Sequence, residues 1–178
     1  MILEIVLYPD PILKTPTQPI ERIEEDIQEL AQNMIETMYA KQGIGLAAPQ
    51  VGSLKRLTVI DISEEKNSPL VLINPYVVRQ SGSQVYEEGC LSFPGLYGKV
   101  ERAAEVDVEY LDQAGNPQKI QGATGLFAIV LQHEIDHLDG LLFIQRMSPA
   151  EKLKHKKALK AFENQYKQKQ KSLKKTKL

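Results

Sequence analysis

Two histidines four residues apart are the strongest chemical signal in this sequence. They lie in the pentapeptide His133-Glu134-Ile135-Asp136-His137, and the chain has only three histidines. On a helix, this spacing places both imidazoles on one face, one turn apart, where they can bind the same metal ion. Glu134 is next to the first histidine, and a carboxylate there can accept a proton from an activated water. The pattern predicts a metal-dependent hydrolytic site; two solvated surface histidines are the weaker interpretation.

The third metal ligand decides the class of enzyme, because such a site usually has three protein ligands and one position open to water. Phe143 stands where one protease pattern has a third histidine. Another protease class uses a glutamate about twenty residues after the second histidine. Glu151 comes too early for that role and Glu163 too late. His155 is available, but it lies in a lysine-rich segment that we expect to face solvent.

Cys90 is the remaining candidate, and it is the only cysteine of the chain. Thiolate binds borderline-soft divalent ions well, and Gly89 before it lets the backbone approach a site closely. A buried, inert cysteine is the competing interpretation, and the residues alone do not separate the two. A Cys/His/His site with a fourth position open to water is the best construction from these residues.

Composition predicts a soluble, single-domain, cytoplasmic protein. The chain has 178 residues, 42% hydrophobic and 25% charged, which is enough to bury one core. A single cysteine excludes an intrachain disulfide and fits a reducing compartment. The N-terminus resembles neither a signal peptide nor a transit peptide. No apolar stretch approaches the length of a membrane span, so we expect no membrane partner.

Hydrophobic spacing predicts the elements that must position these residues. An amphipathic helix is predicted over 26–42 and a second helix, which carries the histidines, over 125–138. Short strands are predicted at 57–62, 70–73, 77–79 and 105–111, and a turn at 112–117 makes a hairpin with 118–121. Short strands and separated helices indicate an α+β fold.

A third helix is predicted to open at Ser148, with Pro149 in its first position and Glu151 completing a capping box. Its apolar stripe ends at Tyr166, so we expect a catalytic domain over 1–166 and a flexible basic tail over 167–178.

Charge is distributed unevenly along the chain. Residues 1–150 hold 11 Lys and Arg against 21 Asp and Glu, whereas residues 151–178 hold 11 Lys against 2 Glu. A basic C-terminal segment on an acidic body could be attracted to a phosphate-rich surface. A solvated lysine segment that aids solubility is an equally good interpretation. Nothing in the chain predicts DNA binding.

Three segments resemble the signature motifs of the peptide deformylases: GIGLAAPQ at 43–50, EGCLS at 88–92 and HEIDHLDG at 133–140. Their order and spacing also fit, and the resemblance spans roughly residues 1–150. It implies an enzyme that removes the formyl group from N-formylmethionine at the start of nascent polypeptides. Because such chains appear at the ribosome, the resemblance also implies that the basic C-terminal segment could be attracted to ribosomal RNA phosphate. It also implies an α+β fold in which the metal helix is packed among antiparallel sheets.

The resemblance implies a ligand set and catalytic roles. Cys90, His133 and His137 would bind the metal, with iron(II) as the implied physiological ion, although zinc, nickel and cobalt also suit this coordination. Glu134 would be the general base. Three further catalytic groups are implied: the Gln50 amide and the Leu91 N–H as donors to the formyl oxygen, and the Gly45 main chain as a substrate contact. From the residues alone, a Gln50 that caps its own loop is the better interpretation.

Five apolar residues are candidates for a methionine pocket beside the metal: Ile44, Leu91, Leu126, Ile129 and Val130. The last three precede the first histidine by seven, four and three residues, on the same helix face. Plain core packing is the alternative.

Glu88 and Arg102 fit a pair that supports the cysteine loop in the family, with a solvated surface pair as the alternative. Tyr97 departs from the arginine that many bacterial members carry, and it resembles the plant-organelle and cyanobacterial type.

Two other functions compete with deformylation. A metalloprotease or aminopeptidase would need a downstream third ligand, which the sequence lacks. A non-catalytic metal-binding module would have no need of Glu134.

Overall fold

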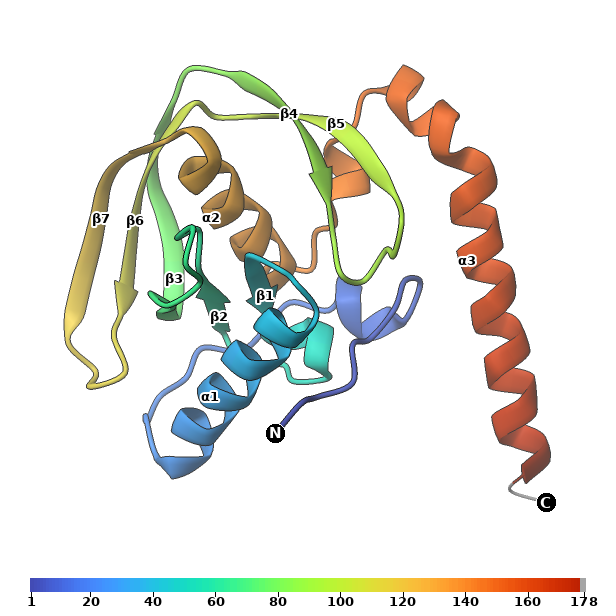
Figure 1. The fold of residues 1–178 in the computed structure, drawn as a ribbon, viewed down its shortest axis with the longest axis horizontal. Helices are drawn as coiled ribbons and strands as arrows, with labels where there is room; N and C mark the ends of the chain where they lie inside the picture. Colours follow the sequence, from blue (N-terminus) through green and yellow to red (C-terminus); the bar gives the residue numbers. More distant parts are fainter. Residues whose placement is uncertain (177–178) are drawn as a thin grey trace.

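The computed structural model, which describes residues 1–176, consists of two antiparallel sheets that enclose a central helix (Figure 1). The helices are α1 (Glu25–Ala40), α2 (Gly125–Leu138) and α3 (Pro149–Thr176), with 3₁₀ turns η1 (Pro11–Lys14), η2 (Ala48–Val51) and η3 (Phe143–Arg146). The strands are β1 (Gly45–Ala47), β2 (Leu57–Ile60), β3 (Leu70–Ser81), β4 (Gln84–Gly89), β5 (Tyr97–Arg102), β6 (Glu105–Leu111) and β7 (Pro117–Thr124). The expected α+β class is confirmed.

The larger sheet has the strand order β1-β2-β3-β6-β7, and β4 pairs only with β5. The two strands predicted at 70–73 and 77–79 are one strand, β3, which is a correction to the sequence analysis. Its register shifts between Ile73 and Tyr76, where Asn74 has a positive φ of 51°. A bulge of this kind lets a strand pass a proline, here Pro75, without ending.

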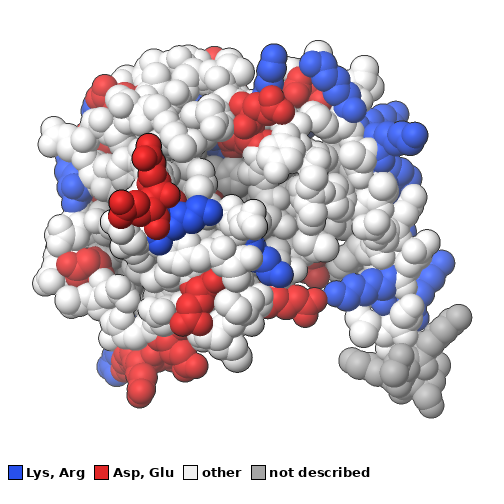
Figure 2. Space-filling model, viewed as in Figure 1, with Lys and Arg blue, Asp and Glu red and all other residues white. Residues whose placement is uncertain are grey.

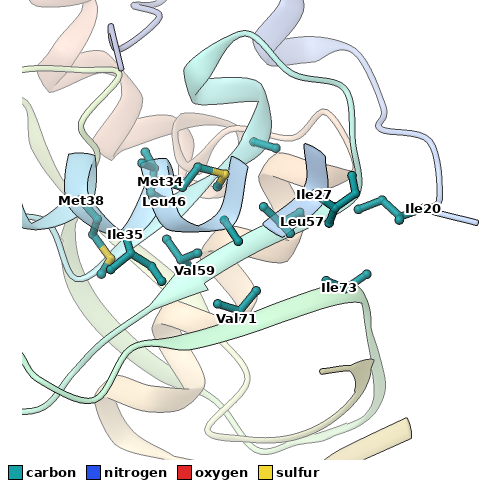
Figure 3. Close-up of a cluster of buried hydrophobic side chains, with 12 residues drawn as sticks. Ile20, Ile27, Met34, Ile35, Met38, Leu46, Leu57, Val59, Val71 and Ile73 are labelled. Atoms are coloured by element: carbon teal, nitrogen blue, oxygen red, sulfur yellow. The ribbon is translucent and has the colours of Figure 1, made fainter. Parts of the chain in front are cut away.

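Alternation along the inner strands gives the larger sheet two apolar faces. Leu57 and Val59 on β2 pack with α1, whereas Ile60 on the same strand packs with α2. Figure 3 shows the first of these clusters, in which Met34 and Met38 of α1 lie over the sheet. Helix α2 is therefore held between the sheet and the rest of the protein, and most of its side chains after the first turn are buried.

Helix α3 begins as predicted, with one difference in its cap. The Ser148 hydroxyl accepts a hydrogen bond from the Glu151 backbone N–H at 3.1 Å. The Glu151 carboxylate does not close the predicted capping box; it accepts from the Lys99 backbone N–H of β5 at 3.0 Å. Glu151 thus joins the start of α3 to the smaller sheet.

An aromatic cluster holds the first half of α3 against the body. Tyr8 stacks on Phe93 with ring centroids 4.7 Å apart, and Phe162 of α3 lies 6.0 Å from Phe93. The helix then continues to Thr176, well beyond the end predicted at Tyr166. Of the flexible tail expected over 167–178, the last two residues lie outside the described part of the chain.

Among residues 1–176, no helix is both long and apolar enough to cross a membrane.

We expect Gly140→Ala to destabilise the protein more than Gly52→Ala. Both glycines have positive φ, +74° and +83°, which costs an L-residue roughly 1–2 kcal/mol. A Cβ at Gly140 would also lie 2.6 Å from the Lys14 backbone oxygen, whereas a Cβ at Gly52 would meet nothing within 4 Å. Urea unfolding should therefore give an additional loss of about 1 kcal/mol or more for Gly140→Ala. Equal losses would show that the backbone at Lys14 moves away freely.

Candidate active site

Three potential ligands from two elements meet beside α2. His133 and His137 face the same side of this helix, and Cys90 follows directly after β4. One ligand atom from each residue can be chosen so that all three lie within 4.8 Å of one another. The Cys90 Sγ is 3.3 Å from the His137 Nε2. The structure thus brings together the three predicted ligands, and both histidines are buried.

The other candidate ligand, His155, lies apart from this cluster on α3. Its Nε2 is 3.3 Å from the Glu151 carboxylate, and the space beside it is occupied by Met147 and Gly98. His155 therefore contributes to the junction of α3 with β5.

The residues of the cluster fit a divalent metal ion. A thiol and two imidazoles are the donor types that borderline-soft metals prefer. Within the described residues, His137 Nδ1 and Glu134 Oε2 are buried without a hydrogen-bond partner, which is uncommon for buried polar atoms. A carboxylate oxygen without a protein donor, next to three ligand groups, suits contact with a water molecule in the site.

Burial and neighbouring groups shift the pKa values of three buried titratable residues of α2 in different directions. Burial alone would lower the pKa of His133, but its bonds to Cys90 and Glu88 raise it to about 10. Burial lowers the pKa of His137 well below its ordinary value, and the nearby His133 adds to this effect. Burial raises the pKa of Glu134 to about 7, although the charges of His133 and Arg102 oppose the shift.

The pair Glu88 and Arg102 is buried, so the alternative of a solvated surface pair is wrong. The Arg102 Nε and Nη2 donate to the two Glu88 oxygens at 2.6 and 2.9 Å, and each side chain is 3% exposed. Glu88 Oε1 also lies 2.7 Å from His133 Nδ1. This contact orients the imidazole and leaves its Nε2 for the cluster.

Sequence reasoning missed two members of this network. Asp136 accepts from Arg102 at 2.9 Å and from Arg146 at 2.9 and 3.1 Å. Asp136 lies inside the histidine motif, and its burial could have been suspected from that position. Arg146 carries no signal in the sequence, because its contact depends on how η3 folds back on α2.

Gln50 caps its own loop, as the residues alone indicated, and its amide also faces the cluster. Its Oε1 accepts from the Ala47 backbone N–H at 2.9 Å, which caps its own loop. Its Nε2 points the other way and lies 3.3 Å from Cys90 Sγ and 3.2 Å from Ser92 Oγ. The carbonyl end thus fixes the side chain while the amide donor faces the cluster.

A cavity of about 780 Å³ opens beside the cluster. It is lined by all five predicted pocket residues, Ile44, Leu91, Leu126, Ile129 and Val130, together with Cys90, His133 and Glu134. Sequence reasoning did not assign Leu7, Tyr86 and Leu96 to this cavity. Tyr97 is 60% exposed at the rim, and its ring covers Gly89, where a Cβ would lie 2.5 Å away.

A family profile described as polypeptide deformylase matches residues 2–153, most of the chain. The chain belongs to the polypeptide deformylase family. It is 50% identical over 161 residues to the peptide deformylase of Rhizobium meliloti (strain 1021), covering 89% of this chain and 90% of that one. Over 164 residues it is 47% identical to the peptide deformylase of Chromobacterium violaceum, covering 92% and 98%.

Solved structures agree with this assignment. A peptide deformylase from Legionella pneumophila superposes with a TM-score of 0.85 at 42% identity, covering 93% of this chain and 98% of that one. A plant peptide deformylase, PDF1B, gives a TM-score of 0.89 at 38% identity, covering 94% and 92%. As a deformylase, this protein removes the formyl group from N-formylmethionine, and metal dependence is general in the family. The metalloprotease and binding-module interpretations are therefore set aside.

Gly45→Ala should inactivate this deformylase by displacing Glu134. A Cβ on Gly45 would lie 2.4 Å from Glu134 Oε1 and 2.9 Å from its Cγ, so the buried carboxylate would have to leave its position. We expect kcat for formate release to fall by at least about 10², the lower range for loss of a general base, with metal content unchanged.

Gly43→Ala is the control, because the nearest atom to its Cβ would be the tip of the Leu91 side chain at 3.0 Å, with the Gly45 oxygen and Met38 at an ordinary 3.5 Å. A similar loss of kcat in both variants would contradict the special role of the Gly45 contact.

Proposed function

We propose that Cys90, His133 and His137 hold one divalent metal ion and that deformylation takes place at this centre. The observation that carries the proposal is the cluster itself, with ligand atoms within 4.8 Å on the wall of an apolar cavity. Iron(II) is our choice for the physiological ion, and zinc, nickel and cobalt suit the same donors. When bound, the metal would act as a Lewis acid toward water and the formyl carbonyl.

Glu134 is the proton carrier in this proposal. Its buried Oε2, which has no partner among the described residues, accepts a proton from the attacking water. The new C–O bond forms at the formyl carbon, the C–N bond breaks, and Glu134 delivers the proton to the leaving amine. The products are formate and a free amino terminus. A pKa raised to about 7 by burial suits a group that must both accept and release a proton.

Gln50 and Leu91 stabilise the charge that develops on the formyl oxygen. The Gln50 amide is buried and held by Ala47, so its donor need not reorganise during the reaction. Leu91 directly follows Cys90, and this places its backbone N–H beside the same centre. Gly45, on β1, lines the same cavity and offers its main chain to the substrate.

The methionine side chain occupies the apolar part of the cavity. Ile129 and Val130 are buried in its wall, whereas Ile44 and Leu126 are each 37% exposed nearer its mouth. Such a surface suits an unbranched thioether chain, because methionine gains from burial without needing a polar partner.

Cys90→Ala and Glu134→Ala separate metal binding from proton transfer. The first variant should lose bound metal and activity together, since only two ligands remain. The second should keep one equivalent of metal while kcat for formate release from a formyl-Met peptide falls by about 10²–10⁴. Metal content and formate release are measured on the same preparations, purified without oxygen. Tight metal binding by Cys90→Ala, or parental turnover by Glu134→Ala, would refute these assignments.

We also propose that the enzyme works in the cytoplasm, where formylated chains leave the ribosome, and that the basic end of α3 contacts ribosomal RNA. Lysines lie along α3 while acidic side chains gather on the body (Figure 2). Lys169 is tied to the body through Glu4 at 3.4 Å. Lys167, Lys171 and Lys174 are exposed and available to phosphate. Residues 1–166 would form the catalytic domain and 167–178 the ribosome-directed segment.

Changing Lys167, Lys171 and Lys174 to Gln should weaken ribosome binding without affecting catalysis. The substitutions keep a helix-forming residue at each position and leave the Lys169–Glu4 contact in place. Co-sedimentation with ribosomes at low salt should fall, with a shallower salt dependence. The value of kcat/KM on a short formyl-Met peptide should not change, because these lysines are remote from the cavity. Equal co-sedimentation across a salt series would contradict the ribosome contact alone.

A further inference from the structure

A chain of four alternating charges runs from the candidate ligand His133 to the surface. Glu88 bonds His133 and is held by both arms of Arg102. The third Arg102 donor reaches Asp136 at 2.9 Å. Arg146 then binds both oxygens of Asp136, at 2.9 and 3.1 Å. Side-chain exposure rises along the chain, from 3% at Glu88 and Arg102 to 12% at Asp136 and 47% at Arg146.

The chain connects two cavities on different sides of the protein. Glu88 and His133 line the substrate cavity. Arg102, Asp136 and Arg146 line a polar groove of about 920 Å³. Solvent therefore reaches Arg146, whereas Glu88, at the other end of the chain of charges, is buried.

Two buried carboxylates compete for one buried guanidinium in this arrangement. Glu88 and Asp136 both accept from Arg102. A buried carboxylate that loses a partner bears a large desolvation cost. Arg146 supplies Asp136 with a second cation, so Arg102 can stay aligned with Glu88. Without Arg146, Asp136 would draw Arg102 toward itself and loosen the grip on Glu88.

We propose that Arg146 is a positioning residue for deformylation: through Asp136 and Arg102 it holds Glu88, and so His133, in the orientation that binds the metal. The inference rests on the proposed function, because it takes His133 as a ligand. The competing role is simpler. Arg146 ends η3 and Asp136 lies on α2, so the pair could serve only to dock one element on the other.

Arg79 provides a matched control. Its side chain is 46% exposed, close to the 47% of Arg146. It likewise binds both oxygens of an aspartate, Asp107, at 3.0 and 3.2 Å. Asp107 bonds Arg79 and the Gly122 backbone on the outer strands. Within residues 1–176, no hydrogen bond or ion pair joins Asp107 to Glu88. Comparing the two arginines thus separates the general effect of losing an exposed two-pronged arginine contact from the specific effect of losing Arg146.

The test compares Arg146→Met, Arg146→Lys and Arg79→Met as cobalt-loaded proteins. Three quantities are measured: the rate of cobalt loss to a chelator, the visible cobalt spectrum, and kcat and KM for a formyl-Met peptide. Arg146→Met should lose cobalt roughly 3- to 10-fold faster and show a similar fall in kcat, below the range for direct partners of a ligand. KM should stay constant, because the pocket wall is untouched, and the cobalt bands should shift.

Arg146→Lys should lie between the parent and Arg146→Met, since an ammonium restores the charge without the two-pronged contact. Arg79→Met should match the parent in all three quantities. The proposal is overturned if the rate of cobalt loss and the kcat of Arg146→Met both lie within twofold of the values for Arg79→Met. Arg146 would then be a docking residue. If Arg146→Met does not fold, Arg146→Lys against Arg79→Lys decides in the same way. A parent protein that binds no cobalt would refute the proposed function itself, which is a distinguishable result.

Discussion

The constraint on which this structure depends is the burial of charge along α2. His133, Glu134, Asp136 and His137 are all buried on one helix that sits between two sheets. Removing each ionised group from water costs several kcal/mol unless partners replace the lost hydration. Arg102 is the main compensation, because it is buried between Glu88 and Asp136 and bonds both. This guanidinium offsets much of the cost of burying two carboxylates beside the histidines.

That requirement explains why the smaller sheet is present. Glu88 and Arg102 lie on β4 and β5, which pair antiparallel, and Cys90 directly follows β4. One hairpin thus delivers a potential ligand, the carboxylate that orients another ligand and the cation that balances it. The larger sheet contributes a different constraint, because β1 passes so close to Glu134 that only a glycine fits at position 45. The two sheets hold the same helix from two sides.

Sequence patterns were sufficient to predict the elements that are determined within a single segment of the chain. The predicted boundaries of α2 agree with the structure, because its apolar spacing and the glycine after it lie within one segment. Strands β1, β4 and β5 were not predicted as strands. Residues 84–89 are largely polar and exposed, and their pairing depends on a partner strand. Likewise, the family resemblance pointed to Glu88 and Arg102, whereas Arg146 could be found only from contacts between η3 and α2. The end of α3 was missed because its lysines suggested fraying, while the structure keeps a contact as far along as Lys169.

The site has two sides with different physical roles. Cys90 is only half-buried and faces the cavity, whose rim carries exposed apolar side chains such as Ile44 and Leu126. The charged network begins at Glu88, next to His133, and water is largely excluded from Glu88 and Arg102. Of the charged network, Glu88 lines the cavity beside the candidate ligands, whereas Arg102, Asp136 and Arg146 line the polar groove. The carboxylate that contacts His133 is thus shared by the cavity and the network, while the arginines that balance its charge line the groove.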